Sequence, residues 1–143
     1  MVKHFISTVH RDRFLRMAAE DDMYPYDSER ASLFYLIAGN DDLYRKRRFI
    51  YDPADHRIRA CLNNPDMDFT SGTGSLIRLG FNLYNGWSDR YTTPLSILSS
   101  LDSNNLKLAG NAIMIRLNRQ FLEELVWEEQ SAVATNQPER RCL

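Results

Sequence analysis

The sequence is poor in the residues that build disulfide frameworks and metal sites. Its 143 residues include two cysteines, Cys61 and Cys142, and three scattered histidines. The cysteines lie far apart and the second sits in a polar tail, which argues against a disulfide framework and favours a reducing compartment. The histidines lack the spacing of zinc ligands, so we expect no metal site and no cofactor.

Long apolar runs and an excess of one charge are also missing. No window is long and apolar enough to span a bilayer, and residues 1–10 lack the apolar core of a signal peptide. The formal net charge is −1, so no field of the whole molecule draws the chain to nucleic acid. These absences predict a cytoplasmic protein without a membrane partner.

The signals that are present are helical. Residues 27–44 begin with side chains that can cap a helix, continue through an apolar run from Ala31 to Ala38, and stop at Gly39-Asn40. A helix that is apolar on most of its circumference must be buried, so this segment should be central. The sequence predicts an all-α fold: a compact single-domain bundle of about six helices over residues 1–134, followed by a disordered C-terminal tail, 135–143.

The expected helices follow from capping residues and apolar periodicity. They cover residues 8–20, 28–38, 41–50, a short piece at 54–57, 75–84, 94–101 and 104–127. The helix at 104–127 should pack across the buried helices 28–38 and 75–84. Its expected buried stripe comprises Leu106, Ala109, Ile113, Leu117 and Phe121, widened by Ala112 and Ile115. Residues 62–74 form the longest irregular stretch.

Several of these segments together carry a family likeness. They are Glu29-Arg30, the run from Leu33 to Asn40, Leu43-Tyr44, the run from Phe81 to Gly86, Pro94-Leu95, Leu101-Asp102, Asn105, Ala112-Ile113 and Ile115-Arg116. The combination, from about Phe5 to Phe121, resembles a small uncharacterised domain family of Gram-positive bacteria and their mobile elements. The resemblance implies a bacterial or phage-related origin but brings no activity or ligand. It admits a role in binding and blocking a host defence protein.

Aromatic residues near loops and helix ends suggest a recognition surface. Rings with polar tips are favoured at protein contacts, although they also plug the ends of helical bundles. Our first hypothesis is therefore a non-catalytic protein-binding module of unknown oligomeric state. Its candidate partner-binding residues are Tyr24, Tyr26, Tyr84, Trp87 and Tyr91.

A basic segment supports a second hypothesis. Cations interleaved with rings are typical of surfaces that bind single-stranded nucleic acid. Here the candidate cations are Arg45, Lys46, Arg48, Arg57 and Arg59, and the rings next to or between them are Tyr44, Phe49 and Tyr51. The alternative is a solvated helix end that nearby aspartates partly neutralise, because consecutive helical positions point in different directions.

Three weaker patterns complete the candidates. Asp52, Asp55 and His56 could form an acid–base cluster, although Asp52 also suits a helix cap. Residues 72–75, Gly-Thr-Gly-Ser, lack the lysine of a phosphate-binding loop, which favours a loop with a hydroxyl cap. The late acidic cluster of Glu123, Glu124, Glu128 and Glu129 could imitate phosphate charge or keep a helix end soluble. No catalytic residue is predicted, which argues against an enzyme.

Overall fold

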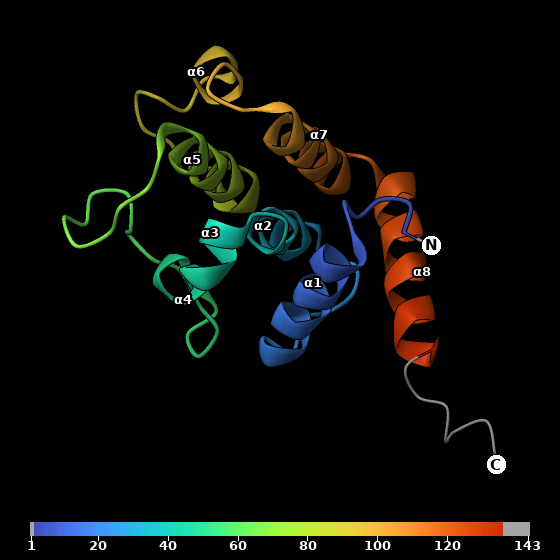
Figure 1. The fold of residues 1–143 in the computed structure, drawn as a ribbon. Helices are drawn as coiled ribbons and strands as arrows, with labels where there is room; N and C mark the ends of the chain where they lie inside the picture. Colours follow the sequence, from blue (N-terminus) through green and yellow to red (C-terminus); the bar gives the residue numbers. More distant parts are fainter. Residues whose placement is uncertain (1, 136–143) are drawn as a thin grey trace.

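The structure, a computed structural model, describes residues 2–135. Within that range it contains eight helices and one short hairpin, which confirms the all-α prediction (Figure 1). The helices are α1 (Thr8–Glu20), α2 (Ser28–Ala38), α3 (Asp41–Arg45), α4 (Arg47–Ile50), α5 (Ser71–Asn85), α6 (Pro94–Leu98), α7 (Ser103–Leu117) and α8 (Arg119–Thr135); the strands are β1 (Tyr51–Asp52) and β2 (Arg57–Ile58). Of the tail predicted at 135–143, only Thr135, the last residue of α8, lies within the described residues.

Helix α2 is the centre of the bundle, as predicted. It contacts α1, α5 and α7, which surround it in Figure 1. Its start is capped by Asp27, whose carboxylate accepts from the Arg30 backbone N–H at 3.1 Å. All eight residues from Ala31 to Ala38 are buried. A helix with no polar face needs neighbours on every side, and the fold supplies them.

Helix α5 lies close against α2 because a glycine faces the contact. A Cβ added at Gly80 would lie 2.8 Å from Leu33 Cδ1. The helix begins four residues earlier than predicted, since Thr70 accepts from the Thr73 backbone N–H at 3.1 Å and caps it. The glycines of the predicted loop at 72–75 therefore lie within the first turns of α5.

The region after α2 differs from the prediction in two places. The single helix expected at 41–50 is interrupted at Lys46 and divides into α3 and α4. The helical piece expected at 54–57 is wrong, because Tyr51 pairs with Ile58 and Asp52 with Arg57 in an antiparallel hairpin. An aspartate before a proline starts a turn as readily as a helix. Here the Asp52 carboxylate accepts from the Ala54 N–H at 2.9 Å and forms the turn.

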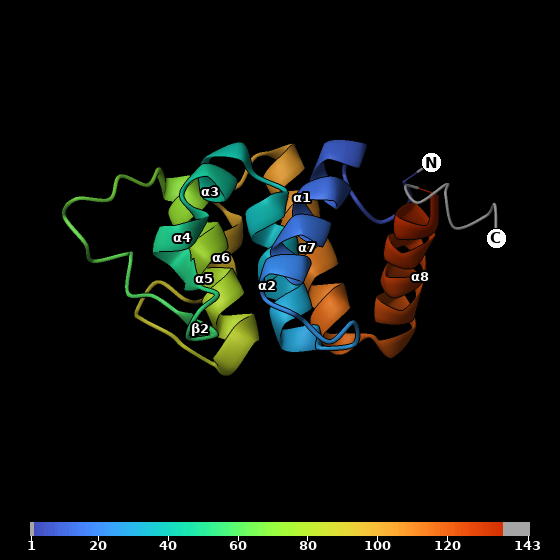
Figure 2. The same cartoon turned by 90° about the horizontal axis from the view of Figure 1, so that it is seen from below.

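The long helix predicted for 104–127 is also wrong, because it is divided at Asn118. The backbone of Asn118 is extended, and its side chain accepts from the Phe121 N–H at 3.0 Å. This bond gives α8 a new capped start. Helix α8 then folds back beside α7 (Figure 2) and buries Leu122, Leu125 and Val126.

Helix α7 packs on α2 and α5 as expected, but its buried face agrees only in part with the predicted stripe. The residues it buries are Leu108, Ala109, Ala112 and Ile115. Leu106 and Leu117, predicted to be core, are 47% and 74% exposed. The expected Ala109, Ala112 and Ile115 are buried, but the periodicity did not exclude Leu106 and Leu117 because apolar residues occur on both sides of this helix.

Candidate functional site

Three helix ends and the hairpin meet at one end of the bundle. The start of α2, the end of α5 and the α7–α8 junction all lie on the side of the hairpin in Figure 2. Two long-range contacts hold them together: Arg116 Nε donates to the Leu83 carbonyl at 2.7 Å, and the Arg119 guanidinium covers the Tyr26 ring at 4.7 Å. We call this region the hairpin end, comprising residues 21–30, 51–58, 83–87 and 116–119.

The most exposed of the predicted contact rings lies at the hairpin end. Tyr24 is 67% exposed, and its ring centroid lies 5.9 Å from that of Tyr26. Arg119 covers the Tyr26 ring from the start of α8. The tyrosine–arginine cluster of Tyr24, Tyr26 and Arg119 therefore joins the α1–α2 turn to a segment more than ninety residues later in the chain.

The other three predicted rings have different surroundings. Tyr84 is half-buried and donates its hydroxyl to the His56 carbonyl at 3.2 Å. Trp87 packs edge-on against Phe81, with ring centroids 5.6 Å apart. Tyr91 lies apart from them, with the guanidinium groups of Arg78 and Arg90 over its ring. Tyr84 and Trp87 thus close the end of the bundle, whereas Tyr91 belongs to the loop after α5.

A buried carboxylate in the turn after α1, Asp21, organises the hairpin end. Asp21 is 1% exposed, and its Oδ1 accepts from the Tyr51 hydroxyl at 2.9 Å. The same oxygen lies 2.8 Å from His56 Nδ1, and Oδ2 lies 3.0 Å from Arg30 NH1. These four residues form what we call the Asp21 hub. Since its members come from the α1–α2 turn, α2, β1 and the hairpin turn, the hub fastens the hairpin to the bundle.

Electrostatics and backbone geometry both mark the Asp21 hub. Burial, and then the adjacent Asp21 carboxylate, raise the pKa of Tyr51 well above its ordinary value. Asp22 and His56 both have φ of 54°, and among the described residues they are the non-glycine residues with positive φ. Left-handed backbone is uncommon outside glycine, although Asp and His tolerate it better than most residues.

The Asp21 hub fixes the orientation of the His56 ring through Nδ1. An imidazole that donates Nδ1–H to Asp21 leaves Nε2 as an acceptor, and the side chain is 47% exposed. The acid–base cluster predicted from Asp52, Asp55 and His56 is not formed. The Asp52 carboxylate is used in the turn, Asp55 is exposed, and His56 turns to Asp21 instead.

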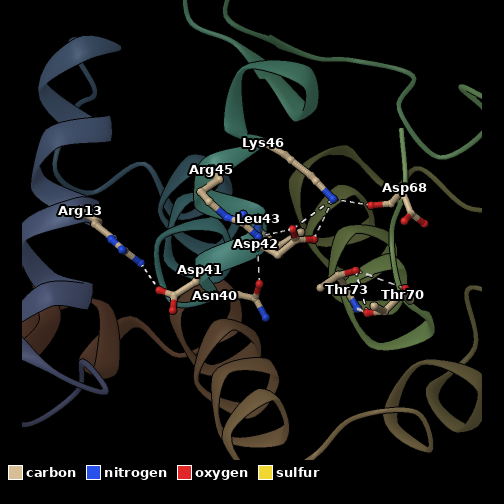
Figure 3. Close-up of polar contacts among 10 residues, drawn as sticks. All are labelled: Arg13, Asn40, Asp41, Asp42, Leu43, Arg45, Lys46, Asp68, Thr70 and Thr73. Carbon is tan, nitrogen blue, oxygen red and sulfur yellow. Dashed lines mark hydrogen bonds and ion pairs between the residues drawn. The ribbon is translucent and has the colours of Figure 1, made fainter. Parts of the chain in front are cut away.

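The predicted basic segment is largely paired with carboxylates (Figure 3). Arg45 and Lys46 lie 2.9 and 3.1 Å from the Asp42 carboxylate, and Lys46 also donates to the Asp68 carbonyl. Arg48 pairs with Glu20 at 3.1 Å. The three cations thus lie on α3, on α4 and on the residue between them, and the carboxylates neutralise part of their charge.

The two remaining cations of the segment lie on and beside the hairpin. Arg59 donates to the Arg48 carbonyl at 3.1 Å, which joins the end of the hairpin to α4. Arg57 is exposed on β2. Arg13 lies 2.5 Å from the Asp41 carboxylate (Figure 3), so a further carboxylate of this region is paired with a cation.

A small hollow at the Asp21 hub leaves about 20 Å³ accessible to water. Its charged lining residues are Glu20, Asp21, Arg47 and Arg48, and Met17, Phe34, Tyr51 and Pro53 complete it. The hollow is therefore too small for anything larger than a water molecule or two. Among residues 2–135, no group of three or more His, Cys, Asp or Glu side chains could hold a metal ion.

Much of the predicted acidic cluster on α8 is engaged within the protein. Glu124 lies 2.9 Å from His4 Nε2, and Glu128 accepts from the backbone N–H groups of Lys3 and His4 at 2.7 and 3.0 Å. Glu123 pairs with Arg119 at 3.1 Å. These carboxylates attach the N-terminal segment to α8 and support Arg119.

Fold and site together define a predominantly helical domain, tied at one end by a buried carboxylate. No helix in the described part of the chain has the length and apolarity needed to cross a bilayer. The chain belongs to a family of unknown function, DUF6075, whose model matches residues 1–129. Neither the curated proteins nor the solved structures contain a significant match.

Proposed function

We propose that this protein is a non-catalytic protein-binding module that contacts its partner through the tyrosine–arginine cluster. Tyr and Arg are enriched at the energetically important positions of protein interfaces. The observation that carries the proposal is the 67% exposure of Tyr24, whose ring centroid lies 5.9 Å from that of Tyr26. A tyrosine offers a large contact area with few rotatable bonds, so it loses little conformational entropy on binding.

The setting we propose is the bacterial cytoplasm, with a host protein as the partner of a phage or mobile-element protein. This step rests on the family resemblance and on the roles common among small proteins of such elements. Tyr84, Trp87 and Tyr91 would lie around the contact rather than at its centre, since the first two are half-buried in the end of the bundle.

Site-specific photo-crosslinking in cells of the source bacterium tests the proposal. A photoreactive phenylalanine analogue at position 24 should give one discrete adduct with a second protein. The matched control is position 49, because Phe49 is a ring of similar exposure, 52%, on α4. No adduct from position 24, or the same adducts from both positions, would contradict the proposal.

The adduct then allows a quantitative test with purified partner. Tyr24→Ala and Arg119→Ala should each weaken binding by about tenfold or more, as expected for central interface residues. Phe49→Ala should leave the affinity unchanged. Turnover of a small molecule by the purified protein would contradict the non-catalytic assignment.

The alternative is association with nucleic acid through Arg45, Lys46, Arg48, Arg57 and Arg59. It has less support, because Asp42 and Glu20 pair with three of these cations. If the alternative is correct, the affinity for single-stranded DNA falls steeply as salt is raised, owing to counterion release. Arg57→Gln should then reduce the slope of that dependence, and absence of binding at low salt would remove the alternative.

A further inference from the structure

Helix α7 presents a continuous apolar face to solvent. Leu106, Met114 and Leu117 are 47%, 39% and 74% exposed, and Ile113 is half-buried between them. Together with Gly110 they form what we call the α7 stripe, about 16 Å long at the rise of an α-helix. Helix α7 packs on α2, α5 and α8, and within the described residues these contacts leave Leu106, Met114 and Leu117 exposed.

A glycine stands in the middle of the α7 stripe without any need from the fold. A Cβ added at Gly110 would meet no atom within 4 Å, whereas one added at Gly80 would meet Leu33. Glycine destabilises a helix interior relative to alanine, so its presence there favours a use outside the monomer. A residue without a side chain allows a second helix to approach closely.

The positions of the α7 stripe are spaced so that two copies fit each other. Leu106, Gly110, Ile113 and Leu117 follow intervals of four, three and four, the alternation of a helix–helix seam. The order of intervals is the same from either end, with its centre between residues 111 and 112. A two-fold axis at that centre therefore sets Leu106 level with Leu117 of a second copy, and Ile113 level with Gly110.

We propose that the α7 stripe is a self-association surface, on which a second copy of this chain packs its own α7 in antiparallel orientation. Ile113 of each copy fills the space above Gly110 of the other. The stripe itself contains no charged side chain, and the exposed Lys107, two turns before Met114, lies at its edge, where the ammonium group can stay in water. A contact built around one helix should cover less than the roughly 800 Å² per partner of a standard interface, which is the size range of weak and transient associations.

Sedimentation velocity over a range of protein concentrations tests the self-association. We expect a monomer at low concentration that converts to a dimer as the concentration rises. Gly110→Glu should lower the association constant at least about tenfold, because it places a charge in the seam. Asn104→Glu is the matched control, since Asn104 is exposed on the same helix but outside the stripe, and it should leave the constant unchanged. A protein that stays monomeric at all concentrations would overturn the proposal.

Disulfide trapping tests the orientation of the two helices. Single-cysteine variants Leu106→Cys and Leu117→Cys are made in a Cys142→Ser background. Cys61 does not interfere, because burial raises the pKa of its thiol to about 11. An equal mixture should yield mainly the disulfide between the two variants, and each variant alone should give little product. If each variant instead pairs efficiently with itself, the helices are parallel and the two-fold antiparallel arrangement is wrong. Neither experiment involves Tyr24, so their outcome is independent of the proposed partner.

Discussion

Acidification should destabilise this protein through His10, a buried histidine at the contact of α1 and α2. The side chain is 3% exposed. Its Nδ1 accepts from the Ile6 backbone N–H at 3.0 Å, so in the neutral ring Nε2 carries the proton and donates to the Tyr35 carbonyl at 2.9 Å. Burial lowers the pKa of His10 from 6.5 to about 4, with a smaller lowering from the nearby Arg13 charge.

The sign and size of the effect follow from proton linkage. The unfolded chain protonates His10 below pH 6.5, whereas the folded protein keeps it neutral down to about pH 4. The unfolded state thus binds more protons in this window, and the free energy of unfolding decreases as the pH falls. A shift from 6.5 to about 4 corresponds to roughly 3 kcal/mol, all of it retained above pH 6.5.

Urea unfolding measured at several pH values checks this expectation. Carboxylates also titrate between pH 4 and 6.5, so the informative quantity is the difference between wild type and His10→Gln. Between pH 4 and 6.5 the free energy of unfolding of the wild type should fall with pH more steeply than that of the variant, by the equivalent of nearly one bound proton. This holds even though the variant is less stable throughout. Parallel curves would refute the reasoning. Nuclear magnetic resonance provides a measurement without a variant, since the His10 ring should show no protonation at pH 5.5.

Three further predictions concern stability. Burial raises the pKa of Glu129 to about 7, so the free energy of unfolding decreases as the pH rises through that value. In urea unfolding, Glu129→Gln should raise this free energy by about 1–2 kcal/mol at pH 8, after allowance for screening, and leave it unchanged at pH 5. Gly80→Ala should lower the melting temperature, because the added Cβ overpacks Leu33 at a cost of about 1–3 kcal/mol. Gly110→Ala has open space at its Cβ, so in dilute protein it should raise the free energy of unfolding by about 1 kcal/mol. Asn118→Ala should lower the free energy of unfolding by about 1 kcal/mol through loss of the α8 cap. The control Asn104→Ala, on the exposed surface, should not change it measurably. Equal effects would mean that the cap does not stabilise the α7–α8 junction.

The sequence alone determined the elements whose signals are local. Helix α2 has the predicted bounds, because Asp27 provides its cap, a nearly continuous apolar run follows, and the helix ends at Ala38, directly before Gly39-Asn40. The all-α class followed from the same kind of evidence. The candidate rings near helix ends were also identified from local sequence, and Tyr24 proved to be strongly exposed.

Tertiary structure decided the features that depend on distant partners. Asp21 acquires its role from Tyr51 and His56, 30 and 35 residues away, and nothing in its neighbouring sequence distinguishes it from a helix-breaking aspartate. Asp52 could cap a helix or start a turn, and formation of the hairpin selected the turn. The division at Asn118 likewise depends on α8 finding apolar cover beside α7.

The two faces of α7 mark the limit of what the sequence could determine. Apolar residues occur on both, so the predicted stripe combined residues that proved to be buried, Ala109, Ala112 and Ile115, with Leu106 and Leu117, which are exposed. The choice depends on shape, since Leu108, Ala109 and Ala112 fit the close approach to α2 and α5 that the larger stripe residues would prevent. Local capping and apolarity fix where a helix forms, but only the complete packed arrangement fixes which side it buries and which side it leaves for a partner.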